Sequence, residues 1–252
     1  VALTKYLFWL KNNFQRKKIT EISAEKKLFN FRKKNKKKNK FYALPKSSVG
    51  ESYKSKVNKI ASKLKKSKCD LQFITASENN AWLLNIRGAD SQYTPIPYSY
   101  ILVDQKKKIT FFCDLKKISP NFKKIYHDIK FIDINSTSEI LSKISKKKFI
   151  IDKSTCSIYF ENIILKNNKI LGQSDLIYYL KAIKKKKEID NIKKAHIYDG
   201  AALTKYLFWL KKNFLKKKIT EISAAQKLLD IRKKNKFFKF SSFPTISGSG
   251  SN

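Results

Sequence analysis

The sequence predicts an α/β fold in which helices cover the faces of a mixed sheet. Two observations carry this prediction. Between residues 57 and 152, short apolar runs typical of buried strands alternate with segments of helical periodicity. From Ile189 to Leu210, apolar residues recur every three or four positions, which indicates one long amphipathic helix. With 252 residues, 42% of them hydrophobic, the chain can bury a core.

The elements between residues 57 and 152 are expected in a definite order. They are an amphipathic helix with Val57, Ile60, Ala61 and Leu64 on its buried face, a buried strand over 71–76, a hairpin of strands 98–103 and 109–113, a strand over 130–134, a helix from Ser136, and a strand over 148–152. Because Glu139 lies three residues after Ser136, we expect the two to form a capping box.

Two further helices are predicted near the C-terminal end. The long helix carries His196 on its apolar face, where we expect the side chain to be buried and hydrogen-bonded. Gly200 in mid-helix costs about 1 kcal/mol relative to alanine, which suggests that another element packs closely there. The last helix is expected to start with Thr220 as its N-cap. Its inner face is predicted to carry Ile222, Ala225 and Leu229.

Residues 1–36 nearly repeat residues 201–236. With an offset of 200, 27 of the 36 positions are identical. Two copies at this separation are not a solenoid repeat. A run rich in lysine and asparagine over 37–41 joins the first copy to the rest of the chain. We expect the second copy to pack on the domain to which it is directly joined, and the first copy to remain exposed.

The chain is strongly basic, with a net charge of +38 from 57 basic and 19 acidic residues. Such a charge by itself suggests nucleic acid or an anionic membrane as a partner. Only four of the basic residues are arginine, and the 53 lysines are scattered along the chain. Nucleic-acid readers favour arginine for bidentate contacts, whereas an A/T-rich coding sequence produces this lysine bias. We therefore predict neither a specific nucleic acid nor a membrane as partner.

Three cysteines, Cys69, Cys113 and Cys156, lie about 44 residues apart and form no CxxC pair. This spacing excludes a zinc ribbon and argues against a disulfide framework, so we expect buried thiols in a reducing compartment. No apolar run approaches the length that crosses a bilayer. The chain begins at Val1 and contains no methionine, which indicates a fragment of a longer protein.

The segment Ser77–Tyr100, SENNAWLLNIRGADSQYTPIPYSY, has the most distinctive chemistry of the chain and is expected to be rich in loop. Gly88 is expected to allow a tight turn, and the two prolines that follow it hold the backbone extended. Arg87 and Asp90 can pair with each other or face a ligand. A rigid connection inside an α/β domain is the alternative to a functional loop.

Three blocks of the sequence resemble the three-domain Xaa-Pro aminopeptidases, pita-bread metallopeptidases that remove an N-terminal residue preceding proline. Residues 78–90 fit the motif D/E-x-x-A-W-L-x-N-x-R-G-x-D of the family's middle domain. The block at 180–210 resembles the passage into the first helix of the catalytic domain, and FPTISGSG at 243–250 resembles its first strand. The blocks follow the family's order and make the resemblance specific over about residues 44–252.

The resemblance implies three parts of the chain. Residues 41–180 are expected to form a middle domain similar to the creatinase N-terminal fold, and residues 181–252 to open a truncated pita-bread domain. Residues 1–40 would be a misplaced copy of that domain's opening helices. The resemblance also implies a cytoplasmic enzyme that can form a homodimer. The alternative from a different class is a non-enzymatic lysine-rich module that binds nucleic acid or an anionic membrane.

The resemblance implies a catalytic centre with two divalent metals, manganese or zinc, held by two aspartates, a histidine and two glutamates. In the family these ligands follow the segment that 243–250 resembles, so we expect no catalytic residue and no metal ligand in this chain. The chain would then be inactive alone. The histidine count agrees, because only His127 and His196 are present. We expect His127 to be solvated, and His196 resembles a family histidine outside the metal site.

Arg87, Asp90 and Tyr93 are the candidates to face the substrate, a proline-containing peptide. The resemblance places their loop toward the catalytic cleft of the intact enzyme, where the Arg87 guanidinium would orient a peptide carboxylate or carbonyl. An ion pair between Arg87 and Asp90 that braces the loop is the structural alternative, and the sequence leaves both open. The residues around Asp90 are smaller or more polar than in the family, which puts fine substrate preference in doubt.

Overall fold

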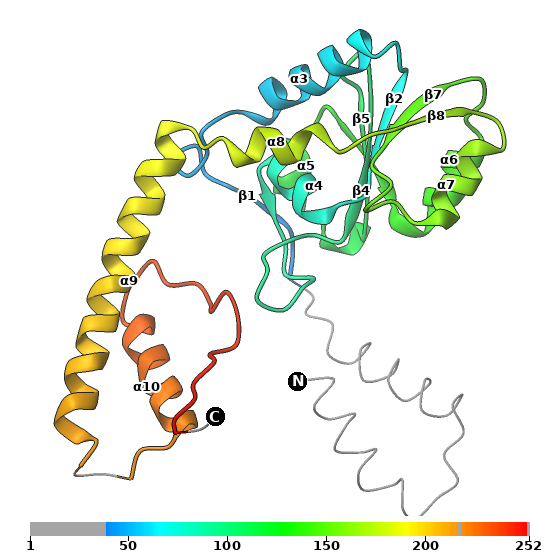
Figure 1. Cartoon of the computed structure of the whole chain (residues 1–252). Helices are drawn as coiled ribbons and strands as arrows, with labels where there is room; N and C mark the ends of the chain where they lie inside the picture. Colours follow the sequence, from blue (N-terminus) through cyan, green and yellow to red (C-terminus); the bar gives the residue numbers. More distant parts are fainter. Residues whose placement is uncertain (1–38, 216–217, 251–252) are drawn as a thin grey trace, which may run out of the picture. The chain divides into compact units, whose positions relative to one another are not determined.

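The computed structural model describes residues 39–215 and 218–250 (Figure 1). Within them lie a six-stranded mixed sheet and a separate two-stranded ribbon, so the α/β prediction is confirmed. The strands are β1 (Tyr42–Ala43), β2 (Leu71–Ile74), β3 (Ile86–Arg87), β4 (Ser99–Asp104), β5 (Ile109–Cys113), β6 (Ile129–Asp133), β7 (Lys148–Ile151) and β8 (Lys169–Gly172). The helices are α3 (Tyr53–Lys66), α4 (Ser77–Leu84), α5 (Pro120–Ile125), α6 (Thr137–Ser142), α7 (Ile158–Leu165), α8 (Leu176–Ala182), α9 (Lys186–Asn213) and α10 (Glu221–Lys233).

The six-stranded sheet has the order β6-β5-β4-β2-β7-β8, which places β2 inside the sheet between an antiparallel and a parallel neighbour. Leu71 of β2 is opposite Asp104 of β4 on one side and Phe149 of β7 on the other. β4 and β5 form the predicted hairpin. β6 and β8 extend the two edges in parallel.

The two faces of the sheet are covered by different helices, as Figure 1 shows. Because successive strand side chains point to opposite faces, the strands supply two separate hydrophobic cores. The first core unites α3, α4, α5 and α8 with the sheet, and its members include Ile60, Leu83, Phe122, Ile177 and Phe111. The second unites α6 and α7 with the other face, and its members include Leu141, Ile164, Phe112 and Phe149. The predicted apolar face of α3 is buried as expected.

The three cysteines are free and buried, which confirms the expectation of buried thiols. Each belongs to one of the two cores. Burial raises the pKa of Cys113 to about 12 and that of Cys156 to about 11. These thiols are therefore protonated and chemically quiet at neutral pH.

The start of α6 differs from the prediction in one detail. Ser136 precedes the helix, but its side chain makes no capping bond and the expected capping box with Glu139 is absent. A short 3-10 turn over Ile134–Ser136 leads directly into the helix, with Ser136 at φ −84° and ψ 1°. A side chain caps a helix when the backbone of the N-cap residue is extended, and in this turn the backbone of Ser136 is not extended. Glu139 instead forms an exposed ion pair with Lys143.

The helices α9 and α10 pack against each other, and Thr220 caps α10 as predicted by accepting a hydrogen bond from the Ser223 N–H. The predicted inner face of α10 is wrong at Ile222, which is 84% exposed, whereas Ala224 is buried. Gly200 continues the helix, but the expected close packing is absent because a Cβ there would meet nothing within 4 Å.

The start of α9 touches the residues that precede the six-stranded sheet. Asn191 Nδ2 donates a hydrogen bond of 3.2 Å to the Ser47 carbonyl oxygen. Farther along, Leu207 and Phe208 are 54% and 60% exposed, so this part of the second copy does not pack on the preceding domain as expected. The first copy, residues 1–36, lies outside the described residues.

Candidate functional site

The candidate segment begins with a helix that the sequence did not predict. α4 buries Asn79, Asn80, Ala81, Leu83 and Leu84, which leaves no one-sided apolar pattern to indicate a helix. The helix ends at Asn85, whose left-handed backbone (φ 56°, ψ 40°) directs its N–H back to the carbonyl oxygens of the last turn.

Arg87 is positioned by the ribbon of β1 and β3, in which it lies opposite Tyr42. Its Nη1 group donates hydrogen bonds to the carbonyl oxygens of Ile86 at 2.8 Å and Ala81 at 3.4 Å. The second bond reaches a carbonyl in the last turn of α4. Burial lowers the pKa of the Arg87 guanidinium from its ordinary value, and nearby Tyr42 opposes this shift. The side chain remains charged at neutral pH.

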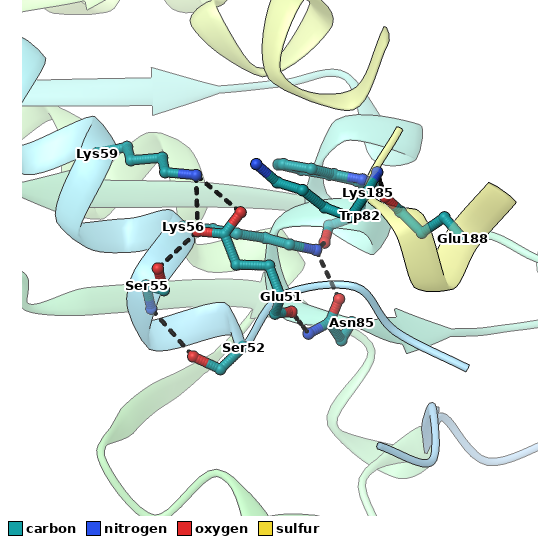
Figure 2. Close-up of polar contacts among 9 residues, drawn as sticks. All are labelled: Glu51, Ser52, Ser55, Lys56, Lys59, Trp82, Asn85, Lys185 and Glu188. Atoms are coloured by element: carbon teal, nitrogen blue, oxygen red, sulfur yellow. Dashed lines mark hydrogen bonds and ion pairs between the residues drawn. The ribbon is translucent and has the colours of Figure 1, made fainter. Parts of the chain in front are cut away.

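A second cation, Lys56 of α3, lies at the same end of α4. Figure 2 shows its Nζ atom donating to the carbonyl oxygen of Trp82 at 2.7 Å and to Oδ1 of Asn85 at 2.6 Å. The ammonium also lies 3.8 Å from the centre of the Trp82 ring. Lys56 is only 3% exposed. Burial lowers its pKa to about 8, although the carboxylates of Glu188 and Glu51 oppose the shift.

The loop between β3 and β4 folds back on itself. The N–H of Gly88 donates to the Pro95 carbonyl oxygen at 3.2 Å, and that of Asp90 donates to the Ile96 carbonyl oxygen at 3.3 Å. A Cβ on residue 88 would lie 2.9 Å from backbone atoms of Pro97 and Ile96. Glycine is therefore needed at position 88 because another backbone segment comes so close. The expected reason, a turn conformation that only glycine adopts easily, does not apply.

Asp90 braces this loop through both carboxylate oxygens. Oδ2 accepts a 2.8 Å hydrogen bond from the Tyr98 N–H, and Oδ1 forms an ion pair with Lys117 Nζ. The Asp90 side chain is 4% exposed. Arg87 forms none of the ion pairs in the described part of the chain, so the brace that the sequence suggested is made by Lys117 instead.

Tyr93 lies in the middle of the same loop, partly buried and with a left-handed φ of 65°. The structure thus brings Arg87, Asp90 and Tyr93 into one folded segment but gives them separate contacts. Asp90 has a bracing role that its surroundings explain. Arg87 keeps donor groups, Nε and Nη2, that bond to none of the residues the structure describes.

The two histidines do not contribute to a metal site. His127 is exposed in the turn after α5, as expected. His196 is exposed on α9, so the prediction of a buried, hydrogen-bonded role is wrong for this structure. Its neighbour Asp199 accepts two hydrogen bonds from Arg232 of α10 instead. Across residues 39–215 and 218–250, no three His, Cys, Asp or Glu side chains come together to form a possible metal site.

Sequence reasoning missed two features near this segment. Lys56 lies four residues before Ile60, on the inner stripe of α3, and that position is the signal by which it could have been found. An open groove of about 360 Å³ lies near the ends of β2 and β7, and seven of its nine lining residues carry a hydroxyl group. They are Thr75, Ser77, Tyr98, Ser99, Tyr100, Ile134, Thr155, Ser157 and Phe160.

None of the helices in the described ranges combines the length and the apolar character that crossing a membrane requires. The relatives and solved structures that resemble the chain include Xaa-Pro aminopeptidases. It is 32% identical over 223 residues to Xaa-Pro aminopeptidase 1 of Dictyostelium discoideum, and 31% identical over 212 residues to an Xaa-Pro aminopeptidase of Caenorhabditis elegans. These alignments cover 85% and 80% of this chain but only 35% and 34% of the relatives. The chain thus spans about a third of the length of the curated relatives it matches.

A solved structure agrees with these alignments. The X-prolyl aminopeptidase of C. elegans, described as a cytosolic enzyme with a di-nuclear active site, superimposes with a TM-score of 0.79 at 27% identity. The superposition covers 88% of this chain and 38% of the C. elegans chain. The Xaa-Pro dipeptidase of Bacillus anthracis, at 17% identity and a TM-score of 0.54, shares the fold. The model of the creatinase/prolidase N-terminal domain matches residues 32–188, and the chain therefore belongs to this family.

Proposed function

We propose that this chain is part of an Xaa-Pro aminopeptidase, a metal-dependent hydrolase that removes the residue preceding proline at the N-terminus of a peptide. The observation that carries the proposal is the extent of the similarity. It continues past residue 188, where the domain match ends, because the C. elegans superposition covers 88% of this chain. The similarity thus extends beyond the sheet into the part of the chain that follows residue 188.

The three parts of the chain have different expected roles. Residues 41–180 would be the middle domain, residues 181–252 the opening of the catalytic domain, and residues 1–40 a second copy of its first helices. Two divalent metals, manganese or zinc, are proposed for the intact enzyme, and the di-nuclear site named for the C. elegans enzyme supports the count. The described residues do not fit such a centre, so we assign them no metal-dependent step.

The contribution of this chain would be to position substrate. Arg87 is the proposed substrate-facing group, with donors left over after its bonds to Ile86 and Ala81. Asp90 would hold the loop in place, because both of its carboxylate oxygens are already engaged. Tyr93 would lie on the same loop as a further substrate-facing side chain. A cytoplasmic location is proposed in line with the cytosolic C. elegans enzyme, and a homodimer remains a prediction.

A hybrid enzyme tests the proposal. Residues 40–252 would replace the matching part of the C. elegans enzyme, which supplies the rest of its catalytic domain. We expect the hybrid to release the first residue from peptides with proline second and to lose this activity when the metal is removed by a chelator. Peptides with alanine second are the matched control. A folded hybrid that cleaves both peptides equally, or neither, would contradict the proposal.

The alternative of a lysine-rich binding module has a separate readout. Binding that neutralises several phosphates weakens steeply with salt, with a log–log slope of about −0.9 per phosphate on duplex DNA. We expect only weak binding without sequence preference, because the described arginines make protein contacts or lie in the peptidase-like loop.

A further inference from the structure

Two arginines in the described part of the chain use their guanidinium groups in opposite ways. Arg232 donates from Nε to Oδ1 of Asp199 at 2.6 Å and from Nη2 to Oδ2 at 2.8 Å. This is the planar two-bond contact that arginine makes with a carboxylate. Arg87 uses Nη1 alone, for the carbonyl oxygens of Ile86 and Ala81. The Nε and Nη2 pair that Arg232 uses for its carboxylate therefore has no protein partner at Arg87 within the described residues.

These two donors of Arg87 are not fully enclosed by the described part of the chain. Of the buried side-chain nitrogen and oxygen atoms in the described part of the chain, Oδ1 of Asn80 is the one that lacks a hydrogen-bond partner. Nε and Nη2 of Arg87 also lack a hydrogen-bond partner among the described residues. Because they are not among the buried atoms without a partner, they are not fully buried. The β1–β3 register places half-exposed Tyr42 opposite Arg87, on the same face of the ribbon.

Two cations, Arg87 and Lys56, lie near the C-terminal end of α4, and the carboxylates of Glu188 and Glu51 act on Lys56 from nearby. Neither Arg87 nor Lys56 forms any of the ion pairs between described residues. The nearby carboxylates have other partners, because Glu51 pairs with Lys59 and Glu188 accepts from the Lys185 N–H (Figure 2). The charge of Arg87 also lowers the pKa of Lys56 by repulsion, an effect smaller than those of burial, Glu188 and Glu51. A bound anion would relieve this repulsion.

We propose that Arg87 binds a carboxylate through its Nε and Nη2 groups, in the planar geometry that Arg232 shows with Asp199. The inference deepens the proposed function and rests on it for the identity of the ligand, which would be the C-terminal carboxylate of a short peptide substrate. Lys56 stays bonded to Trp82 and Asn85 and contributes charge without touching the ligand. Tyr42 forms the rim beside the guanidinium.

The test measures binding to the full 252-residue chain and needs no catalysis. The four arginine Nε–Hε signals are followed by NMR while Ala-Pro-Ala is added with a free C-terminus, and separately with an amidated C-terminus, at constant ionic strength. We expect the Arg87 signal to shift and saturate with the free acid and not with the amide. Acetate should produce the same shift at higher concentration.

Variants separate the planar contact from charge alone, with binding followed through the Tyr42 backbone amide. Arg87→Gln should abolish saturable binding, and Arg87→Lys should weaken it at least about tenfold because lysine keeps the charge but loses the fork. Arg232→Gln is the matched control and should leave peptide binding unchanged, since Asp199 occupies that guanidinium. Backbone amide spectra check that each variant is folded.

Several outcomes would overturn the inference: equal binding by Arg87→Lys, equal binding of the amidated peptide, parallel shifts of all four arginines, or no saturable shift. Preferred binding of inorganic phosphate over the peptide acid would also overturn the assignment of a carboxylate. The proposed function fails separately. If the hybrid enzyme does not cleave Xaa-Pro peptides while Arg87 still binds the peptide acid, the site stands and the aminopeptidase assignment falls.

Discussion

Lys56 illustrates how a single buried charge shapes this domain. Its ammonium group donates a hydrogen bond to the Trp82 carbonyl oxygen at the C-terminal end of α4, where a cation complements the helix dipole. The same group lies over the face of the Trp82 ring. The cost is desolvation, which lowers its pKa from 10.5 to about 8. The folded state therefore releases this proton at a lower pH than the unfolded state does.

This difference predicts a pH dependence of stability with a definite sign. Between pH 8 and 10.5 the unfolded chain holds the Lys56 proton more tightly than the folded chain, so the Lys56 contribution to the free energy of unfolding rises with pH. From pH 8 to 9 the gain is about 1 kcal/mol. Below about pH 7 both states are protonated and this contribution is flat.

The measurement is urea unfolding of the wild-type chain and of Lys56→Met across this range. The variant is needed because the buried thiols, with pKa values raised to about 12 and about 11 at Cys113 and Cys156, lower stability as pH rises through 9. Both proteins share that loss. The free energy of unfolding of the wild type minus that of Lys56→Met should therefore increase by about 1 kcal/mol from pH 8 to 9. A difference that stays constant over this range would show that Lys56 titrates normally.

Whether a helix or strand could be predicted from the sequence depended on how its side chains are buried. α3 was predicted because it has one buried face with a clear period, and the hairpin of β4 and β5 because two short apolar runs flank a polar turn. α4 was missed because it is buried on nearly all sides. In the candidate site, the sequence singled out Arg87 and Asp90, but not the Lys117 partner of Asp90, which is distant along the chain. Such pairings depend on tertiary packing, which local pattern does not record.

The helix α9 offers a test of backbone propensity without packing effects. Gly200 lies in mid-helix, and a Cβ there would have nothing within 4 Å. Gly200→Ala should therefore stabilise α9 by about 0.5–1 kcal/mol through reduced freedom of the unfolded chain. Amide hydrogen exchange of the residues around 200 measures the change directly.

Gly88→Ala is the matched control and should have the opposite sign. The added Cβ would lie 2.9 Å from backbone atoms of Pro97 and Ile96, which cannot yield as a flexible side chain can. We expect a loss of about 1–3 kcal/mol in the free energy of unfolding. If both alanine variants change stability in the same direction, close backbone approach is not the reason for glycine at 88.

The whole molecule carries a net charge of +38, because 57 basic residues face only 19 acidic ones. The ion pairs Lys54–Asp128, Lys143–Glu139 and Lys147–Asp70 are exposed at both side chains, and such pairs each contribute under about 1 kcal/mol. Repulsion between lysines then opposes the compact state, and it weakens when salt shortens the range of the interaction.

We therefore expect the melting temperature to rise when sodium chloride increases from about 0.01 M to about 0.1 M, where the Debye length falls from about 30 Å to about 10 Å. A gain of about 1 kcal/mol corresponds to about 2–4 °C for a domain of this size. Sodium fluoride at equal ionic strength is the control, since screening does not depend on the anion. A melting temperature that falls with salt would mean that attractive pairs outweigh the repulsion.

The strand order has a consequence for how the domain reaches its structure. β2 can pair with β4 soon after the β4–β5 hairpin is made, but its other side waits for β7, since Leu71 is opposite Phe149. Closing so long a loop is entropically costly and slows folding. During synthesis, the hairpin and β2 would therefore form an early unit whose β2 edge stays open until β7 is made. That edge is the place where a newly made chain would meet other chains and aggregate, until β7 docks and covers it.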